Sequence, residues 1–84
     1  MKFKNLKYNK MYHLRTAETS REPSDDEWIA KVISVNKDYI AFDDVWIIKG
    51  VPADYDYRFG EKNFNREVEI IKEITKETHP EYFL

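Results

Sequence analysis

The segment WIAKVISVNKDYIAFDDVWII, residues 28–48, decides the fold. In its first half Trp28, Ala30 and Val32 fall on every second position, and most residues there are β-branched or aromatic. Side chains of this type at a period of two are typical of a β-strand that lays one face against a core. The sequence therefore predicts a strand over residues 28–35 with the indole of Trp28 pointing inward.

The second half of the same segment continues the sheet. Residues 36–38 are turn formers between two apolar runs, so they predict a hairpin whose returning strand covers residues 39–42. Two adjacent acids, Asp43 and Asp44, interrupt the apolar pattern and predict a bend or a bulge. A further strand is expected over residues 45–48.

Toward the N-terminus, residues 11–16 alternate apolar and polar side chains, which predicts a half-buried strand. Residues 17–27 are acidic and contain Ser and Pro, so they predict a long exposed loop. Residues 1–10 are basic, alternate weakly and end in a turn at Asn9, and we expect a basic first strand to begin here. They contain no apolar stretch, so we expect no signal peptide. Uncharged runs in the rest of the sequence are short, such as residues 32–36 and 45–48, so we also expect no membrane span.

Toward the C-terminus, residues 53–65 are polar and aromatic and predict a second long loop. Residues 66–75 are ambiguous, because the isoleucines and valine favour a strand whereas the glutamates and lysines favour a helix. We prefer a strand, because it would complete the sheet. Pro80 suits the first position of a short helical turn over residues 78–83.

Composition limits the class of protein. The chain has 84 residues, which predicts one domain over residues 1–84. It contains no cysteine, which excludes a zinc site built on thiolates and favours a reducing, cytoplasmic compartment. The net charge is only -2, but residues 1–15 hold five basic and no acidic side chains, whereas the acids gather after residue 16. A solvated surface with a local preference of sign is the interpretation we prefer, and a partner surface steered by charge is the alternative.

Catalytic chemistry has no recognisable basis in the sequence. The two histidines, His13 and His79, are far apart and have no metal ligands at a suitable spacing. The chain has only two glycines, so it lacks a phosphate-binding loop, and no serine sits in a nucleophile elbow. We expect a protein that is not an enzyme and that has no cofactor and no metal.

Residues 25–44 resemble the centre of Tudor-type domains, which are five-stranded barrels of the Src-homology-3-like class. The aromatic-x-Ala-x-Val pattern of their second strand is matched by residues 28–32, and the hydrophobic-x-Phe-x-Asp pattern of their third by residues 40–44. The resemblance implies a mainly β, small five-stranded Src-homology-3-like (Tudor-like) barrel with two long loops and a short C-terminal helical turn.

The same resemblance implies positions for an aromatic cage that would hold methylated lysine or arginine by cation–π attraction. By position its members would be Trp28, Tyr39, Phe42 and Asp44. Ordinary packing and solvation of these four residues is the interpretation we prefer.

The two long loops are the expected binding elements, because one is acidic and the other combines aromatics with an arginine. We expect a non-enzymatic binding module, a small accessory or inhibitory protein of the kind that bacteriophages encode, which docks a basic protein surface. The expected contact residues are Glu22, Asp25, Asp26, Glu27, Tyr55, Tyr57, Arg58 and Phe59.

The alternative is a nucleic-acid-binding small barrel that uses the basic N-terminal strand, where charges and aromatics interleave. Its expected contacts are Lys2, Lys4, Lys7, Lys10 and Arg15. The acids that dominate residues 16–84 oppose this alternative, because they would repel a phosphate backbone.

Overall fold

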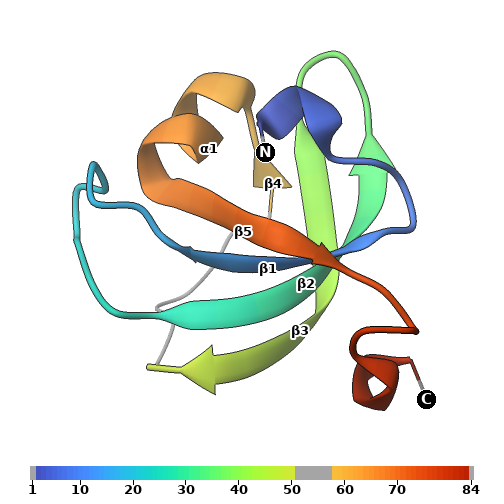
Figure 1. The fold of residues 1–84 in the computed structure, drawn as a ribbon. Coiled ribbons are helices and arrows are strands. Elements are labelled where there is room, and N and C mark those ends of the chain that lie inside the picture. Colours follow the sequence, from blue (N-terminus) through green and yellow to red (C-terminus); the bar gives the residue numbers. More distant parts are fainter. Residues whose placement is uncertain (1, 51–57, 84) are drawn as a thin grey trace.

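The computed structural model describes residues 2–50 and 58–83, with only the backbone described at residues 44 and 45 (Figure 1). In these residues it contains five strands, one α-helix and two short 3₁₀ turns. In chain order they are η1 (Phe3–Asn5), β1 (Met11–Thr16), β2 (Glu27–Val35), β3 (Ile40–Lys49), β4 (Arg58–Phe59), α1 (Glu61–Glu67), β5 (Val68–Ile74) and η2 (Pro80–Tyr82). The prediction of a mainly β protein is confirmed.

The strands form one antiparallel sheet in the order β4-β3-β2-β1-β5. β1 lies between β2 and β5, so the last strand returns to the first. The two outer strands of the described sheet, β4 and β5, do not pair with each other, so the sheet is open at that side rather than closed into the expected barrel (Figure 1). The helix α1 sits between these two strands in the chain.

The hairpin predicted from residues 36–38 is confirmed. The Asn36 side-chain Oδ1 accepts hydrogen bonds from the backbone N–H groups of Asp38 at 2.8 Å and Tyr39 at 3.0 Å. The backbone N–H of Asn36 in turn donates to the carbonyl of Tyr39 at 3.1 Å. This is the local side-chain bonding that makes asparagine favourable in turns.

The strands expected over residues 39–42 and 45–48 are one strand, β3. Lys31 pairs with Asp43 and Ile29 pairs with Trp46, so β3 holds one more residue than β2 between these two pairs. The predicted bulge is therefore confirmed, whereas the predicted break is wrong. A bulge absorbs an extra residue by a local bend and lets pairing continue on both sides.

The prediction that a basic strand begins in residues 1–10 is wrong, because residues 2–10 contain no strand. The backbone forms the 3₁₀ turn η1, in which Asn5 N–H donates to the Lys2 carbonyl at 2.8 Å and Leu6 N–H to the Phe3 carbonyl at 3.1 Å. Asn9 then adopts the left-handed conformation, with φ 67°, which agrees with the turn expected there. The local bonds satisfy backbone groups that a strand would have paired across a sheet.

The region after residue 57 differs from the predicted loop. Residues 58–65 form β4 and most of α1, which begins after Gly60 and ends where Val68 N–H donates to the Phe64 carbonyl. The prediction of a strand over residues 66–75 is confirmed by β5. Residues 66 and 67, the first two of the predicted range, belong to the end of α1. The mixed sequence signal thus came from a helix that passes directly into a strand.

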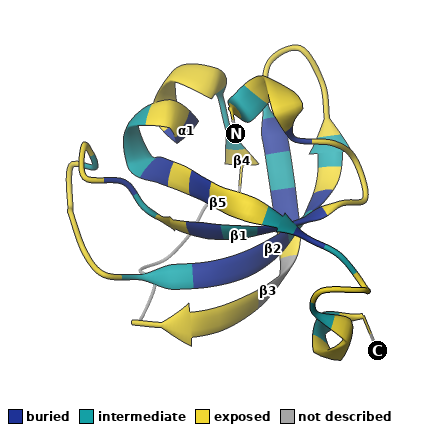
Figure 2. Ribbon diagram, in the orientation of Figure 1, coloured by how far each residue is buried: buried dark blue, intermediate teal, exposed yellow. Residues whose placement is uncertain are grey.

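The main core lies on the concave face of the sheet, beneath η1 and α1 (Figure 2). Phe64 from α1 stands at its centre, with ring centroids 5.4 Å from Phe3, 5.9 Å from Phe42 and 5.6 Å from Phe59. The remaining buried members are Leu6, Tyr12, Leu14, Trp28, Ala30, Val32, Ile40, Val68 and Ile70. The inward orientation of Trp28, Ala30 and Val32 is as the sequence predicts.

A smaller apolar cluster covers the opposite face of the sheet. Met11, Ile29 and Ile74 are buried there, and Tyr82 from η2 packs against them. The ring of Trp46 meets the ring of Tyr82 edge to face at 5.5 Å between centroids. The C-terminal helical turn, with Pro80 at its first position, is therefore confirmed and covers part of a second small core.

The hydroxyl of Tyr12 links β1 to the chain that precedes it. Tyr12 is fully buried, and its oxygen accepts a hydrogen bond from Lys7 N–H at 2.9 Å and donates to the Asn5 carbonyl at 3.4 Å. Replacing Tyr12 with phenylalanine would leave both backbone groups without this partner. We expect Tyr12→Phe to lower the free energy of unfolding by about 1–2 kcal/mol at neutral pH.

This loss should depend on pH in a defined direction. Burial raises the pKa of Tyr12 above its usual 10.0, so the folded state holds this proton more tightly than the unfolded state. The stability that the hydroxyl contributes is complete below pH 10 and is lost as pH rises through the folded-state pKa. Urea unfolding from pH 7 to 11 should show the gap between wild type and Tyr12→Phe shrinking, and a gap that stays constant would contradict this account.

Candidate functional site

The acidic residues expected to bind a partner lie on the β1–β2 loop, residues 17–26, and at the start of β2. Asp25, Asp26 and Glu27 line a shallow groove of about 230 Å³, which we call the acidic groove. Its other lining residues are Arg15, Thr16, Glu18, Ser24 and Lys49. Glu22 is exposed on the same loop but does not line this groove.

The first half of the β1–β2 loop is tied to the junction of α1 and β5. Ala17 N–H donates to the Glu67 carbonyl at 3.0 Å, and the Thr19 hydroxyl donates to the Arg66 carbonyl at 2.7 Å. Arg21 N–H donates to the Glu67 carboxylate at 3.0 Å, a bond that, with the nearby Arg66 and Arg21 guanidinium groups, lowers the pKa of Glu67. The loop therefore has a fixed course here rather than the freely exposed one expected from the sequence.

The second half of the loop is held against the end of β3. Thr16 N–H donates to the Asp26 carbonyl at 3.1 Å, and Asp26 N–H donates to the Ser24 hydroxyl at 3.3 Å. Gly50 has φ 83°, and a Cβ at this position would lie 1.8 Å from the Asp26 Oδ1 atom. Asp26 can occupy its place only because residue 50 has no side chain.

Two of the groove's carboxylates already contact basic side chains of the same chain. Glu27 Oε1 lies 3.1 Å from His13 Nε2, and Asp25 Oδ2 lies 3.8 Å from Lys49 Nζ. The Asp25 and Lys49 side chains are largely exposed, and exposed pairs of this kind contribute little energy. A partner's cation can therefore compete with Lys49 at little cost.

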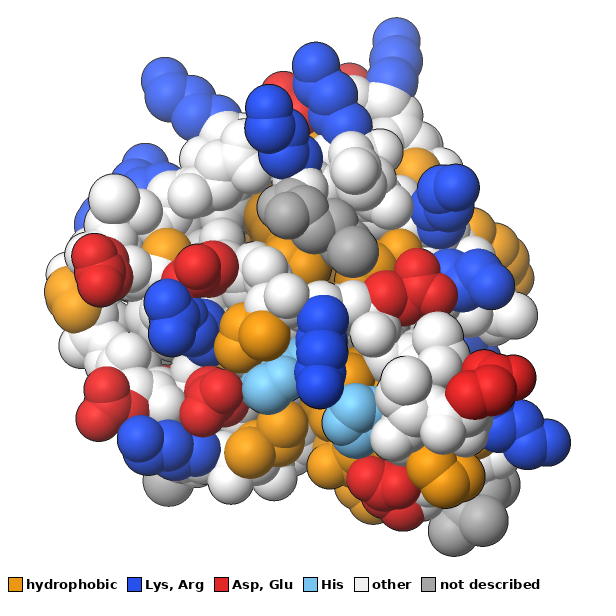
Figure 3. Space-filling model, viewed as in Figure 1, with side chains coloured by type: hydrophobic (Ala, Val, Ile, Leu, Met, Phe, Trp, Pro, Cys, Tyr) orange, Lys and Arg blue, Asp and Glu red, His pale blue; other side chains and the backbone are white. Residues whose placement is uncertain are grey.

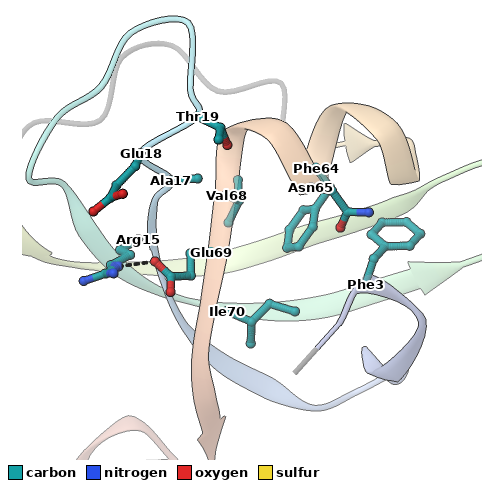
Figure 4. Close-up of a pocket in the computed structure, with 10 residues that line it drawn as sticks. All are labelled: Phe3, Arg15, Ala17, Glu18, Thr19, Phe64, Asn65, Val68, Glu69 and Ile70. Carbon is teal, nitrogen blue, oxygen red and sulfur yellow. Dashed lines mark hydrogen bonds and ion pairs between the residues drawn. The ribbon is translucent and has the colours of Figure 1, made fainter.

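A second hollow of about 380 Å³, which we call the β5 groove, lies beside β5 (Figure 4). One side is apolar and is formed by Phe3, Phe64, Val68 and Ile70, while Arg15, Glu18 and Glu69 gather on the other side. Ala17, Thr19 and Asn65 complete the lining. The sequence did not single out this groove.

An ion pair forms the charged side of the β5 groove. Arg15 Nε donates to Glu69 Oε2 at 2.5 Å, across the pairing of β1 with β5. The hydrogen bond and charge of Glu69, with smaller contributions from Glu18 and Glu27, raise the pKa of Arg15. Glu18 and Glu69 together carry one more charge than Arg15 neutralises.

The structure describes only part of the second predicted contact loop, residues 53–65. Tyr55 and Tyr57 lie outside the described residues. Arg58 is exposed in β4, with its guanidinium 4.8 Å from the centre of the Tyr39 ring. Phe59 is half-buried, and its ring packs against Phe42 and Phe64 at the margin of the main core, so its role as a contact residue stays a prediction.

The positions implied for an aromatic cage are also placed in part. Trp28 is 3% and Phe42 4% exposed, because both rings belong to the main core. Neither ring is therefore accessible to a ligand. Tyr39 is half-buried at the end of the β2–β3 turn.

The basic residues of the alternative function do not form one strand. Arg15 lies on β1 and is paired with Glu69, whereas four exposed lysines lie before, in and after η1: Lys2, Lys4, Lys7 and Lys10. Lys4 shares a hollow of about 320 Å³ with Lys37 and several apolar side chains. Figure 3 shows lysine and arginine side chains around the upper part of this view and acids below them on the left.

Residues 2–50 and 58–83 contain no group of three acidic, histidine or cysteine side chains that would hold a metal ion. None of the helices in these same ranges is long and apolar enough to cross a membrane.

Comparisons with known proteins were made with both sequence and fold. Neither the protein-family models, nor the curated protein sequences, nor the solved structures gave a match to this chain.

Proposed function

We propose that this protein is a non-enzymatic binding module that docks a basic protein surface. The observation that carries the proposal is the acidic groove, where four carboxylates meet two basic side chains on one exposed surface. Opposite potentials on two partners steer their association and fix its register. An inhibitor that covers a basic groove is the form we favour, since carboxylates would then stand where phosphates bind.

The fixed course of the β1–β2 loop supports this proposal. A loop that is already ordered loses little conformational freedom on binding, so more of the contact energy appears as affinity. The bonds from Ala17, Thr19 and Arg21 to the α1–β5 junction provide this order at one end of the loop. The packing of Asp26 against Gly50 orders the other end of the loop.

We also propose that the fold is an open variant of the Src-homology-3-like class. The strand order supports this, because β1 pairs with both β2 and β5 and so brings the last strand beside the first. The α1 helix joins β4 to β5 in the chain, and these two strands do not pair with each other. Phe64 on this helix supplies the central ring of the core, which a closed barrel would obtain from its strands.

Affinity capture from a lysate of the native organism tests the proposed function. The bait is the full chain, compared with a variant in which Asp25, Asp26 and Glu27 are alanine and with a control in which Glu77 and Glu81 are alanine. Wild type and control should capture the same basic proteins, and the groove variant should lose most of them. Because the attraction is electrostatic, capture should weaken as salt rises.

Equal capture by the groove variant would contradict the proposal. Labelled single- and double-stranded oligonucleotides at low salt provide the competing arm of the test. Binding of these oligonucleotides that is lost when Lys2, Lys4, Lys7 and Lys10 become alanine would favour the nucleic-acid alternative instead.

A further inference from the structure

The outer edge of β5 lies at the end of the sheet. β5 pairs with β1 on one side, and no described residue pairs with it on the other. Unpaired strand edges are templates for the addition of another strand, and folded proteins usually block them. The β5 groove lies beside this strand, so residues 2–50 and 58–83 leave open space there (Figure 4).

The hydrogen-bond pattern shows which backbone groups face the open edge. Ala17 N–H donates to the Glu67 carbonyl, and the register continues through Thr16 with Val68 to Leu14 with Ile70. Bonded and non-bonded pairs alternate in an antiparallel ladder, so the backbone groups of Val68 and Ile70 point away from β1. Val68 N–H is used by the Phe64 carbonyl at the end of α1. The Val68 carbonyl and both groups of Ile70 remain on the open edge.

The groove offers two different environments on the two sides of this edge. Toward the core, Ile70 and Val68 lie beside the rings of Phe3 and Phe64. Toward the outer face, Glu69 and Glu18 surround Arg15 and leave an excess of one negative charge. An added strand would point successive side chains alternately to these two sides, because its side chains have a period of two.

We propose that the outer edge of β5 binds an extended peptide in which apolar and basic side chains alternate. The peptide residue opposite Ile70 exchanges backbone hydrogen bonds with it and places its apolar side chain against Phe3 and Phe64. The next residue lies opposite Glu69 and places a lysine or arginine beside Glu69 and Glu18. Backbone bonds give the affinity in this mode of recognition, and the alternating pockets give the specificity.

This inference rests on the proposed function and narrows it. The acidic groove and the β5 groove share Arg15 and Glu18, so they form one continuous surface. A basic protein that docks on the β1–β2 loop would therefore have its strand or tail beside β5. The partner class becomes a basic protein with an extended segment rather than any basic surface.

The direct test uses a synthetic peptide of about seven residues in which lysine and valine alternate, titrated into the ¹⁵N-labelled full chain up to about 1 mM. We expect amide shifts at residues 68–70 and Thr19, and slower hydrogen exchange of the Ile70 amide in the complex. Two control peptides have the same composition. One is N-methylated at alternate amides, and the other has its lysines and valines in two separate blocks.

A charge variant tests the basic half of the pattern. Glu18→Lys with Glu69→Lys should weaken binding of the alternating peptide by about tenfold or more, since two favourable contacts become repulsive. Glu77→Lys with Glu81→Lys makes the same change of charge at exposed positions elsewhere and should leave the affinity unchanged. If the lysine variant does not fold, Glu18→Gln with Glu69→Gln removes the same two charges and should also weaken binding of the peptide.

Three results would overturn the inference. They are no binding up to the highest peptide concentration, equal binding of the N-methylated peptide, and binding that leaves exchange at Ile70 unchanged. If capture of basic proteins still depends on Asp25, Asp26 and Glu27, such a result removes the β5 site and leaves the proposed function standing. If capture does not depend on these three acids but the peptide still binds at β5, the result contradicts the role of the acidic groove and leaves the β5 site standing.

Discussion

Replacing Phe64 with alanine is expected to lower the free energy of unfolding by about 3–5 kcal/mol. A domain of 84 residues has a total of about 4–13 kcal/mol, so this one change removes much of its stability. The reason is the position of the ring, which is 1% exposed and contacts the three other phenylalanines that close the core.

Urea unfolding followed by tryptophan fluorescence measures this effect. Phe83→Ala is the matched control, because Phe83 is 38% exposed and its loss should cost less than about 1 kcal/mol. If Phe64→Ala does not fold, Phe64→Leu keeps the comparison and should show a smaller loss. Similar stabilities for Phe64→Ala and Phe83→Ala would show that α1 is not part of the core.

The second large effect is expected on the opposite face of the sheet. Ile29→Ala should lower the free energy of unfolding by about 2–5 kcal/mol, because Ile29 is 1% exposed beneath Tyr82 of the C-terminal turn. Ile33 lies on the same strand but is 46% exposed, and Ile33→Ala should cost less than about 1 kcal/mol.

The comparison between these two isoleucines tests whether η2 covers a second core. Thermal unfolding of both variants and of Tyr82→Ala gives the measurement. Tyr82→Ala should share part of the loss of Ile29→Ala, since it uncovers the same cluster. If Ile29→Ala and Ile33→Ala lower the free energy of unfolding by equally small amounts, η2 does not bury a second core on this face.

The part of the fold that could be predicted is the part that local patterns determine. Alternation places Trp28, Ala30 and Val32 inward, the side chain of Asn36 makes the turn, and the two acids mark the bulge. Each of these features depends on residues a few positions apart. Alternation also places Ile29 away from the main core, but it does not show that η2 buries it.

The helix α1 was missed because its sequence is short and adjoins a strand. Residues 61–67 combine good helix formers with two asparagines and a phenylalanine, which have low helix propensity, so the segment suggested a loop. The helix brings one buried ring to the core and then passes into β5 without a connecting loop. A window that spans residues 66–75 therefore averages two kinds of structure.

The grooves depend on contacts between distant parts of the chain. Arg15 and Glu69 are 54 positions apart, and Phe3 reaches Phe64 from the opposite end of the sequence. No local pattern connects such residues. The acids of the β1–β2 loop were visible as charges, whereas the β5 edge became visible only when β5 was found beside β1.

The close packing of Asp26 against Gly50 holds the β1–β2 loop against the end of β3. A Cβ at position 50 would overlap the Asp26 Oδ1 atom, and the φ of 83° strains any residue other than glycine at this position. Position 50 should therefore remain glycine among descendants of this chain, whichever residue stands at position 26.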